Sequence, residues 1–228
     1  MTNMSLVKAG GVCAILASIL YVVGLVFFFS VGEIPGRAEM GKRLEFFADH
    51  QTAIVIALWF FVLAFLLQVA AAIGFYQALR QVGPVLLLAL VASATGFLFA
   101  TIFMFTNLGF AYELGPGYMS GDAASRPALE VVAKTLGATN SLVDSFSHVL
   151  FWGIGFGLFA WASLKAAVVP KWMAWVGLLA ALLVGGAGAF ESVWKAADIT
   201  ASVSLIPFLA WMVAMGVGLL RRREPTTA

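Results

Sequence analysis

Charge and reactive side chains are scarce in this sequence. Of its 228 residues, 11% are Asp, Glu, Lys or Arg, one is cysteine and two are histidine, and the net charge is +2. Soluble domains are about 25% charged, and disordered chains combine high charge with few apolar residues. The single cysteine, Cys13, cannot form an intrachain disulfide. These shortages exclude a soluble globular domain, a disordered chain and a disulfide-rich module, and the low net charge predicts no nucleic-acid partner.

Recognisable catalytic motifs are also missing. The sequence has no Walker motif, no GxSxG, no HExxH, no HxxxH and no GxGxxG between a strand and a helix. Each of these patterns sets essential groups at a fixed spacing, so their absence removes the common nucleotide-binding, serine-hydrolase and zinc-protease classes. The two histidines, His50 and His148, are too few for a three-histidine metal site. We therefore expect no cofactor and no bound metal.

Apolar residues dominate instead, at 62% of the chain with 20 phenylalanines. A membrane-spanning helix needs about 20 mainly apolar residues. The expected helices cover residues 9–31, 52–78, 84–112, 141–164, 172–194 and 201–220. The first is expected to be a retained helix, because it is longer than the roughly 7–15 apolar residues of a signal peptide. We predict an all-α polytopic membrane protein in which residues 1–228 form a single domain of six transmembrane helices.

The connections between these helices alternate in length. Those at 79–83 and 165–171 are short, so the helices that they join are expected to be antiparallel neighbours. The longer loops, 32–51 and 113–140, contain amphipathic stretches that either lie flat on the membrane or cap the bundle. Gly115, Pro116, Gly117 and Gly121 predict a mobile turn in the second loop.

The distribution of positive charge predicts the orientation. The face with the termini and the short loops carries Lys8, Arg80, Lys165, Lys171, Arg221, Arg222 and Arg223. These lie within roughly thirty residues, whereas the other Lys and Arg residues are spread over about fifty residues of the opposite face, together with every acidic residue except Glu224. Cytoplasmic loops are enriched in Lys and Arg close to helix ends. Both termini are therefore predicted to be cytoplasmic.

Small residues mark the expected packing faces. Gly153 and Gly157 are four residues apart on the fourth helix, and Gly185 and Gly186 are adjacent on the fifth. Small residues let two helix backbones approach closely in lipid. The pattern predicts tight packing within the chain, with a homodimer interface as the alternative.

Ionisable residues gather near the outer ends of the predicted helices. Asp144 and His148 are spaced i, i+4 on the fourth helix, so they share a face. Other candidates at a similar depth are Glu113, Glu191, Lys195 and His50. Ionisable groups at membrane depth are costly and are often functional, so these residues predict a ligand-binding cavity or a proton relay. The alternative is that the carboxylates face lipid headgroups and that His148 is a packing residue bonded to Asp144.

The fourth and fifth helices carry a family resemblance. The stretch HVLFWGIGFGLFAWASLKAAVVPKWMAWVGLLAALL, with His148, Pro170 and Trp172, resembles a bacterial six-helix membrane family known only as a domain of unknown function (number 4386). The stretch AAAIGFYQALRQVGP is similar to the second helix and turn of that family. The resemblance implies six helices and a multi-pass location in the inner (plasma) membrane. It implies no activity.

Three classes of function remain open, and the sequence does not decide whether the protein is an enzyme. The leading hypothesis is a membrane-embedded binding or transport-like protein with an outward-facing polar cavity for a small molecule or a lipid headgroup. The second is an accessory subunit that packs against a membrane partner protein through its glycine faces. The third is a lipid-modifying enzyme, which requires a base or a metal at headgroup depth. Membrane lipids are expected partners in each case.

Overall fold

The computed structural model describes residues 4–191 and 194–222 as a bundle of helices, and this part of the chain contains no strand. Its elements are α1 (Met4–Ser30), η1 (Arg37–Glu39), α2 (Met40–Asp49), α3 (Gln51–Leu79), η2 (Arg80–Val82), α4 (Val85–Gly109), η3 (Phe110–Leu114), α5 (Gly115–Ser120), α6 (Arg126–Ser147), η4 (His148–Phe156), α7 (Gly157–Ala166), α8 (Lys171–Gly188) and α9 (Lys195–Leu220). Consecutive helical elements join end to end, and in the described residues this gives six spans that are long and apolar enough to cross a membrane. The predicted all-α fold with six transmembrane helices is therefore confirmed.

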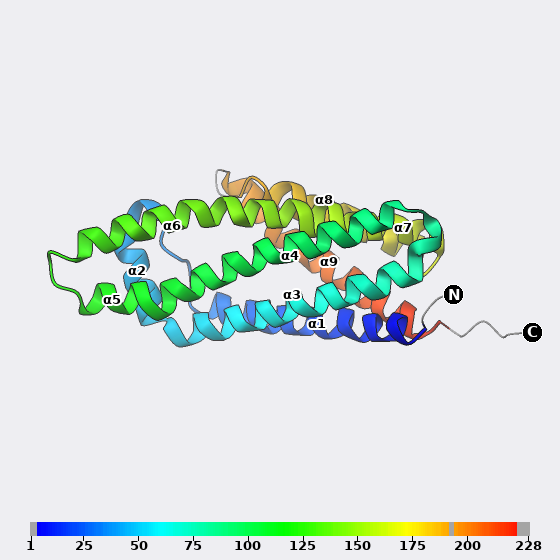
Figure 1. Ribbon diagram of the computed structural model, residues 1–228, viewed down its shortest axis with the longest axis horizontal. Helices are drawn as coiled ribbons and strands as arrows, with labels where there is room; N and C mark the ends of the chain where they lie inside the picture. Colours follow the sequence, from blue (N-terminus) through cyan, green and yellow to red (C-terminus); the bar gives the residue numbers. More distant parts are fainter. Residues whose placement is uncertain (1–3, 192–193, 223–228) are drawn as a thin grey trace, which may run out of the picture.

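Both ends of the bundle can be named from the chain path in Figure 1. We call the end at which α1 begins and α9 ends the terminal face, and the opposite end the distal face. The connections at the terminal face are short, as predicted: η2 joins α3 to α4, and residues 167–170 join α7 to α8. Arg223 and Glu224, which entered the orientation prediction, lie outside the described residues.

Two of the spans are far longer than a bilayer requires. Val85–Ser120 has 36 residues and Arg126–Ala166 has 41, which correspond to about 54 and 60 Å of helix. Because a bilayer core is about 30 Å thick, the excess projects beyond the membrane at the distal face. Figure 1 shows α5 and the start of α6 extending past the ends of α1 and α3.

Most of the predicted loop 113–140 is helical, so the turn predicted from Gly115 onward begins only at Gly121. Gly115 continues the helix after η3, because its missing side chain leaves room for the backbone of α2: an added Cβ would lie 2.9 Å from the carbonyl oxygen of Leu44. Pro116 is in the first turn of α5, where its missing N–H is not needed. The actual turn covers 121–125, where the Asp122 carboxylate accepts a hydrogen bond from the Ser125 N–H at 2.8 Å.

The amphipathic stretch 38–50 forms a short helix, α2, that caps the projecting end of the bundle. Its apolar side, with Met40, Leu44 and Phe47, is buried against neighbouring elements. The ring centroids of Phe47 and Phe110 are 5.6 Å apart. Of the two arrangements predicted for this stretch, the cap is thus the one that the structure adopts.

The predicted ends of the first, fifth and sixth helices also need correction. The first helix begins at Met4 rather than at residue 9, the fifth ends at Gly188 rather than at 194, and the sixth begins at Lys195 rather than at 201. Hydropathy locates the apolar middle of a helix, whereas Lys195–Thr200 contains Lys195 and Asp198 and is helical without a continuous apolar run.

The projecting part of α6 can be tested by chemical labelling. In a Cys13→Ala background, a Thr135→Cys variant is expected to react with a membrane-impermeant maleimide in open membrane sheets, because Thr135 is exposed in the projecting half of α6. Leu98→Cys is expected to stay unlabelled until detergent is added, because Leu98 is 60% exposed but lies mid-span, where it faces lipid. Equal labelling of the two variants in the membrane would contradict the projection.

Candidate functional site

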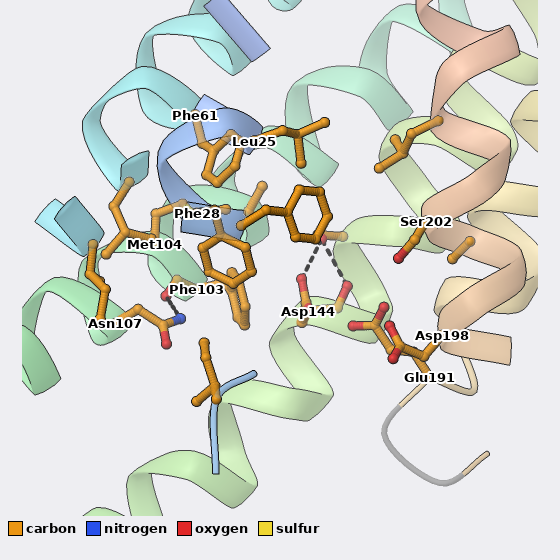
Figure 2. Close-up of a pocket in the computed structure, with 18 of the residues that line it drawn as sticks. Leu25, Phe28, Phe61, Phe103, Met104, Asn107, Asp144, Glu191, Asp198 and Ser202 are labelled. Carbon is orange, nitrogen blue, oxygen red and sulfur yellow. Dashed lines mark hydrogen bonds between the residues drawn. The ribbon is translucent and has the colours of Figure 1, made fainter. Parts of the chain in front are cut away.

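A cavity of about 710 Å³ lies between the distal halves of the helices. Its apolar lining is largely aromatic and includes Tyr21, Leu25, Phe28, Phe61, Phe65, Phe103, Met104 and Trp152. Its polar lining includes Glu33, Arg43, Asn107, Asp144, Ser147, His148, Glu191, Asp198 and Ser202. In Figure 2, Phe28, Phe61, Phe103 and Leu25 lie to one side, while the carboxylates of Asp144, Glu191 and Asp198 gather on the other. The cavity therefore has an aromatic half and an acidic half.

The acidic half lies near the distal edge of the membrane. His148 is 18 residues before Ala166, where α7 ends at the terminal face, which corresponds to about 27 Å of helix. A bilayer core is about 30 Å thick. The polar groups of the cavity are therefore at the depth where hydrocarbon gives way to headgroups, so that a ligand there can place one end in each environment.

Asp144, His148 and Glu191 form the centre of the acidic half. The Nδ1 of His148 lies 3.1 Å from the backbone carbonyl oxygen of Asp144 and 3.6 Å from its carboxylate Oδ1, and the Nε2 lies 3.9 Å from Oε2 of Glu191. A carbonyl oxygen can only accept a hydrogen bond, so Nδ1 carries a proton and the Nε2 of neutral His148 presents a lone pair. The side chain of Asp144 is 13% exposed, that of His148 12% and that of Glu191 24%.

Glu191, which lies beyond the end of α8, has a strongly perturbed carboxyl group. Its burial raises its pKa to about 9, and the hydrogen bond to the Asp144 carboxyl and the charge of that group act in the same direction, while His148 opposes them. Two carboxylates that share a hydrogen bond do not both ionise readily. At neutral pH, Glu191 therefore keeps its proton, and its O–H donates a hydrogen bond to the Asp144 carboxylate.

This pKa shift predicts how stability depends on pH. Unfolded Glu191 loses its proton near the ordinary glutamate pKa of 4.5, whereas the folded protein holds the proton up to about 9. The folded state therefore binds the extra proton between these values, and stability falls as the pH rises through this range. We expect the melting temperature of the wild type to decline from pH 5 to 9, and this decline to be shallower in Glu191→Gln. Glu113→Gln, a change at an exposed carboxylate, is expected to keep the wild-type slope.

The position of His148 depends on local backbone geometry. The π-helix η4 begins at this residue and runs for nine residues to Phe156; π segments are rare and frequently occur at functional sites. The backbone of Gly153 in η4 touches that of Gly185 in α8, and a Cβ on Gly188 would collide with the His148 ring. Because Gly188 has no side chain, the imidazole can lie against α8. Its ring centroid is 4.7 Å from that of Trp152.

The other residues predicted for the site lie elsewhere. Glu113 is exposed in η3, in the projecting part of the chain, and Lys195 is exposed at the start of α9. His50 stacks on Phe46, with ring centroids 4.4 Å apart, and its Nδ1 lies 3.1 Å from the Phe46 carbonyl oxygen. None of the three lines the described cavity. All three belong to the distal part of the chain path, but their side chains lie outside the cavity.

The predicted packing glycines also separate into two groups. Gly153 and Gly185 form a backbone contact, whereas a Cβ on Gly157 would make ordinary contacts, 3.7 Å from the Trp152 carbonyl oxygen and 4.0 Å from Ala181. A Cβ on Gly186 would meet nothing within 4 Å. Gly185 and Gly186 are adjacent in the sequence but have different roles, because they lie on different faces of α8.

Several residues of the cavity were not singled out as site residues by the sequence pattern. Asp198 fell in a predicted loop, but in α9 it shares a helical face with Ala201, Ser202 and Leu205, all of which line the cavity. That i, i+3, i+4, i+7 spacing is a signal that could have identified it. Asn107 also lines the cavity, and its amide donates to the Phe103 carbonyl oxygen at 2.9 Å.

The central cluster also has the composition of a metal site. One ligand atom from each of Asp144, His148 and Glu191 can be chosen so that all lie within 4.8 Å of one another. Metal-binding histidines commonly donate their second N–H to a backbone carbonyl, as Nδ1 of His148 does here. Two carboxylates and an imidazole would suit a divalent transition metal.

These features define a polytopic helical membrane protein with a half-aromatic, half-acidic cavity at one membrane surface. The chain belongs to the family described as Domain of unknown function (DUF4386), whose model matches residues 9–222. This match confirms the resemblance seen in the sequence and covers all six spans. No curated protein and no solved structure shows a significant match.

Proposed function

We propose that this protein is a bacterial inner-membrane binding or transport-like protein whose cavity accepts an amphipathic organic cation, such as an amine with an apolar tail. The observation that carries the proposal is the pairing of an acidic cluster with an aromatic wall in one cavity of about 710 Å³. Both termini lie in the cytoplasm in this proposal, so the cavity opens on the outer side. The density of Lys and Arg at the terminal face supports that orientation.

The charges of the cavity favour a positive headgroup. Four acidic residues line it, Glu33, Asp144, Glu191 and Asp198, against a single arginine, Arg43. The guanidinium of Arg43 is already engaged: its Nη1 donates to the Pro35 carbonyl oxygen at 3.0 Å, and its Cζ lies 5.6 Å from the centroid of the Phe47 ring. Even with Glu191 protonated, the cavity therefore has an excess of negative charge, which attracts a cation and repels an anion.

The aromatic half supports the same class of ligand. Tyr21, Phe61 and Phe65 pack as a group, with the Tyr21 ring centroid 5.0 Å from that of Phe61 and 5.8 Å from that of Phe65. Aromatic faces attract organic cations, with an interaction of about 0.5–2 kcal/mol each, and they also bury an apolar tail. A ligand with an ammonium head and an alkyl tail can therefore place its head by Asp144 and its tail along these rings.

Binding can be measured directly with simple amphiphiles. Protein in nanodiscs is titrated with octylammonium, octanol and octanoate, and the tryptophan emission is compared with that of a Trp152→Phe variant, because Trp152 lines the cavity. Saturable quenching by octylammonium that is lost in the variant is expected, with octanol weaker and octanoate inactive. Tighter binding of octanoate, or signals of equal size from all three, would overturn the proposal.

A second candidate is a metal-dependent enzyme that acts on lipids, and the convergence of Asp144, His148 and Glu191 within 4.8 Å favours it. A divalent ion held there would supply Lewis-acid chemistry at headgroup depth. In this alternative, purified protein incubated with Zn²⁺ and desalted retains one ion per chain by elemental mass spectrometry, and His148→Ala retains none. Octylammonium binding without metal retention would leave the cation-binding proposal in place and remove this one.

A further inference from the structure

A second cavity lies at the opposite end of the molecule, on the terminal face. Its volume is about 480 Å³. The connection between α7 and α8 and the first turn of α8 form one wall, with Val168, Trp172 and Met173. The last turns of α9, with Val217, and the two residues that follow this helix, Arg221 and Arg222, form the other. We call this the terminal groove. Because it lies where the spanning helices end, it is at the depth of the lipid headgroups.

Two arginines, Arg221 and Arg222, stand at one end of the terminal groove. The Nη1 of Arg222 donates to the carbonyl oxygen of Ala78 at 2.8 Å, and neither Arg221 nor Arg222 forms an ion pair with a described residue. Within the described ranges, every acidic residue lies toward the distal face of the bundle, at the opposite end from the terminal groove. Partial burial lowers the pKa of Arg222, because removing a guanidinium from water disfavours its charged form. The site is therefore complementary to an anion.

The rest of the terminal groove is apolar. Val168, Val169, Met173 and Val217 supply aliphatic surface, and Trp172, with 64% of its surface exposed, is the kind of residue that lies at the boundary between headgroups and acyl chains. A free inorganic anion would use the arginines but not this surface. A phospholipid would use both.

We propose that the terminal groove binds one anionic phospholipid, with its phosphate between Arg221 and Arg222 and an acyl chain along Val168, Met173 and Val217. Basic pockets between transmembrane helices are suited to this class of lipid. The inference is independent of the distal cavity and of its ligand. In the orientation proposed above, the groove faces the cytoplasmic leaflet.

Lipid retention measured by native mass spectrometry tests the proposal. Protein is equilibrated with equal amounts of phosphatidylglycerol and phosphatidylcholine in neutral detergent micelles, and the lipid that stays bound is identified and counted. We expect one phosphatidylglycerol per chain, and an Arg221→Gln/Arg222→Gln double variant to bind it about 30-fold more weakly. The melting temperature of the double variant shows whether its fold is intact. Lipid binding by an Arg221→Lys/Arg222→Lys variant, which keeps both charges, shows whether the site is intact.

Two comparisons distinguish this site from general attraction. Lys165→Gln removes a positive charge from the same face, but Lys165 lies 4.1 Å over the Trp161 ring and outside the groove, so phosphatidylglycerol binding should be unchanged. Millimolar inorganic phosphate or glycerol phosphate should not displace the lipid. Equal retention of the two lipids, an equal loss in Lys165→Gln, or displacement by free phosphate would each overturn the proposal.

Discussion

Replacing Gly185 with leucine is expected to lower the melting temperature of the protein by about 2–12 °C, whereas the same replacement at the adjacent Gly186 should leave it nearly unchanged. A Cβ on Gly185 would fall on the backbone of Gly153 and 3.1 Å from the His148 carbonyl oxygen. Neither backbone can move aside without separating α8 from η4. Overpacking of this kind typically costs about 1–3 kcal/mol, and each kcal/mol shifts the melting temperature of a chain of this size by about 2–4 °C.

Gly186→Leu is a matched control, because it adds the same side chain one residue further along the same helix. Nothing lies within 4 Å of a Cβ at Gly186, so a leucine there would extend into lipid. The measurement is thermal unfolding of both variants in the same detergent. Equal losses would indicate that an effect common to both positions, and not the contact with Gly153, is responsible, and would contradict the packing described for η4.

Asp144→Asn is expected to weaken the binding of octylammonium by about 10- to 100-fold. A hydrogen bond to a charged group is worth about 1.5–3 kcal/mol, and each 1.4 kcal/mol changes affinity tenfold. Asparagine keeps the shape of the side chain but carries no charge. The substitution also keeps the backbone carbonyl oxygen that lies 3.1 Å from His148 Nδ1 and accepts from the Ser147 hydroxyl at 2.8 Å.

The comparison for this variant is Glu113→Gln, which also removes one negative charge near the distal face. Glu113 is exposed and does not line the cavity, so binding should be unchanged. Isothermal titration calorimetry in nanodiscs gives both affinities. If the two variants weaken binding equally, a diffuse surface potential accounts for the affinity, and the specific site at Asp144 is wrong.

The spans of this protein were predictable from the sequence, but their lengths were not. Apolar windows located the membrane-crossing part of every helix, because insertion into hydrocarbon requires about 20 apolar residues in succession. Outside the membrane that requirement ends. The stretch from Glu113 to Ser120 and the first half of α6 therefore show no continuous hydropathy signal, although they are helical and pack against α2.

The chemistry of the cavity was predictable in part. The i, i+4 spacing of Asp144 and His148 placed them on one face of a helix, and the structure puts these two side chains at 3.6 Å. Spacing along the chain could not show that Glu191 joins this cluster, or that Glu113, His50 and Lys195 do not. The hydropathy pattern puts all of them near the outer ends of the predicted helices, but it does not give the direction in which a helix presents a side chain to its neighbours.

The sequence by itself determined that this chain is an all-α membrane protein with six spans, because composition and hydropathy are sums over local residues. Only the tertiary structure decided which polar residues converge. That outcome depends on the rotation of α8 against η4, which is set where Gly153 meets Gly185 and where the space above Gly188 holds His148. The π-helical turn that begins at His148 also changes the faces of the residues that follow. These are contacts between segments about thirty to forty residues apart, so no local pattern in the chain encodes them.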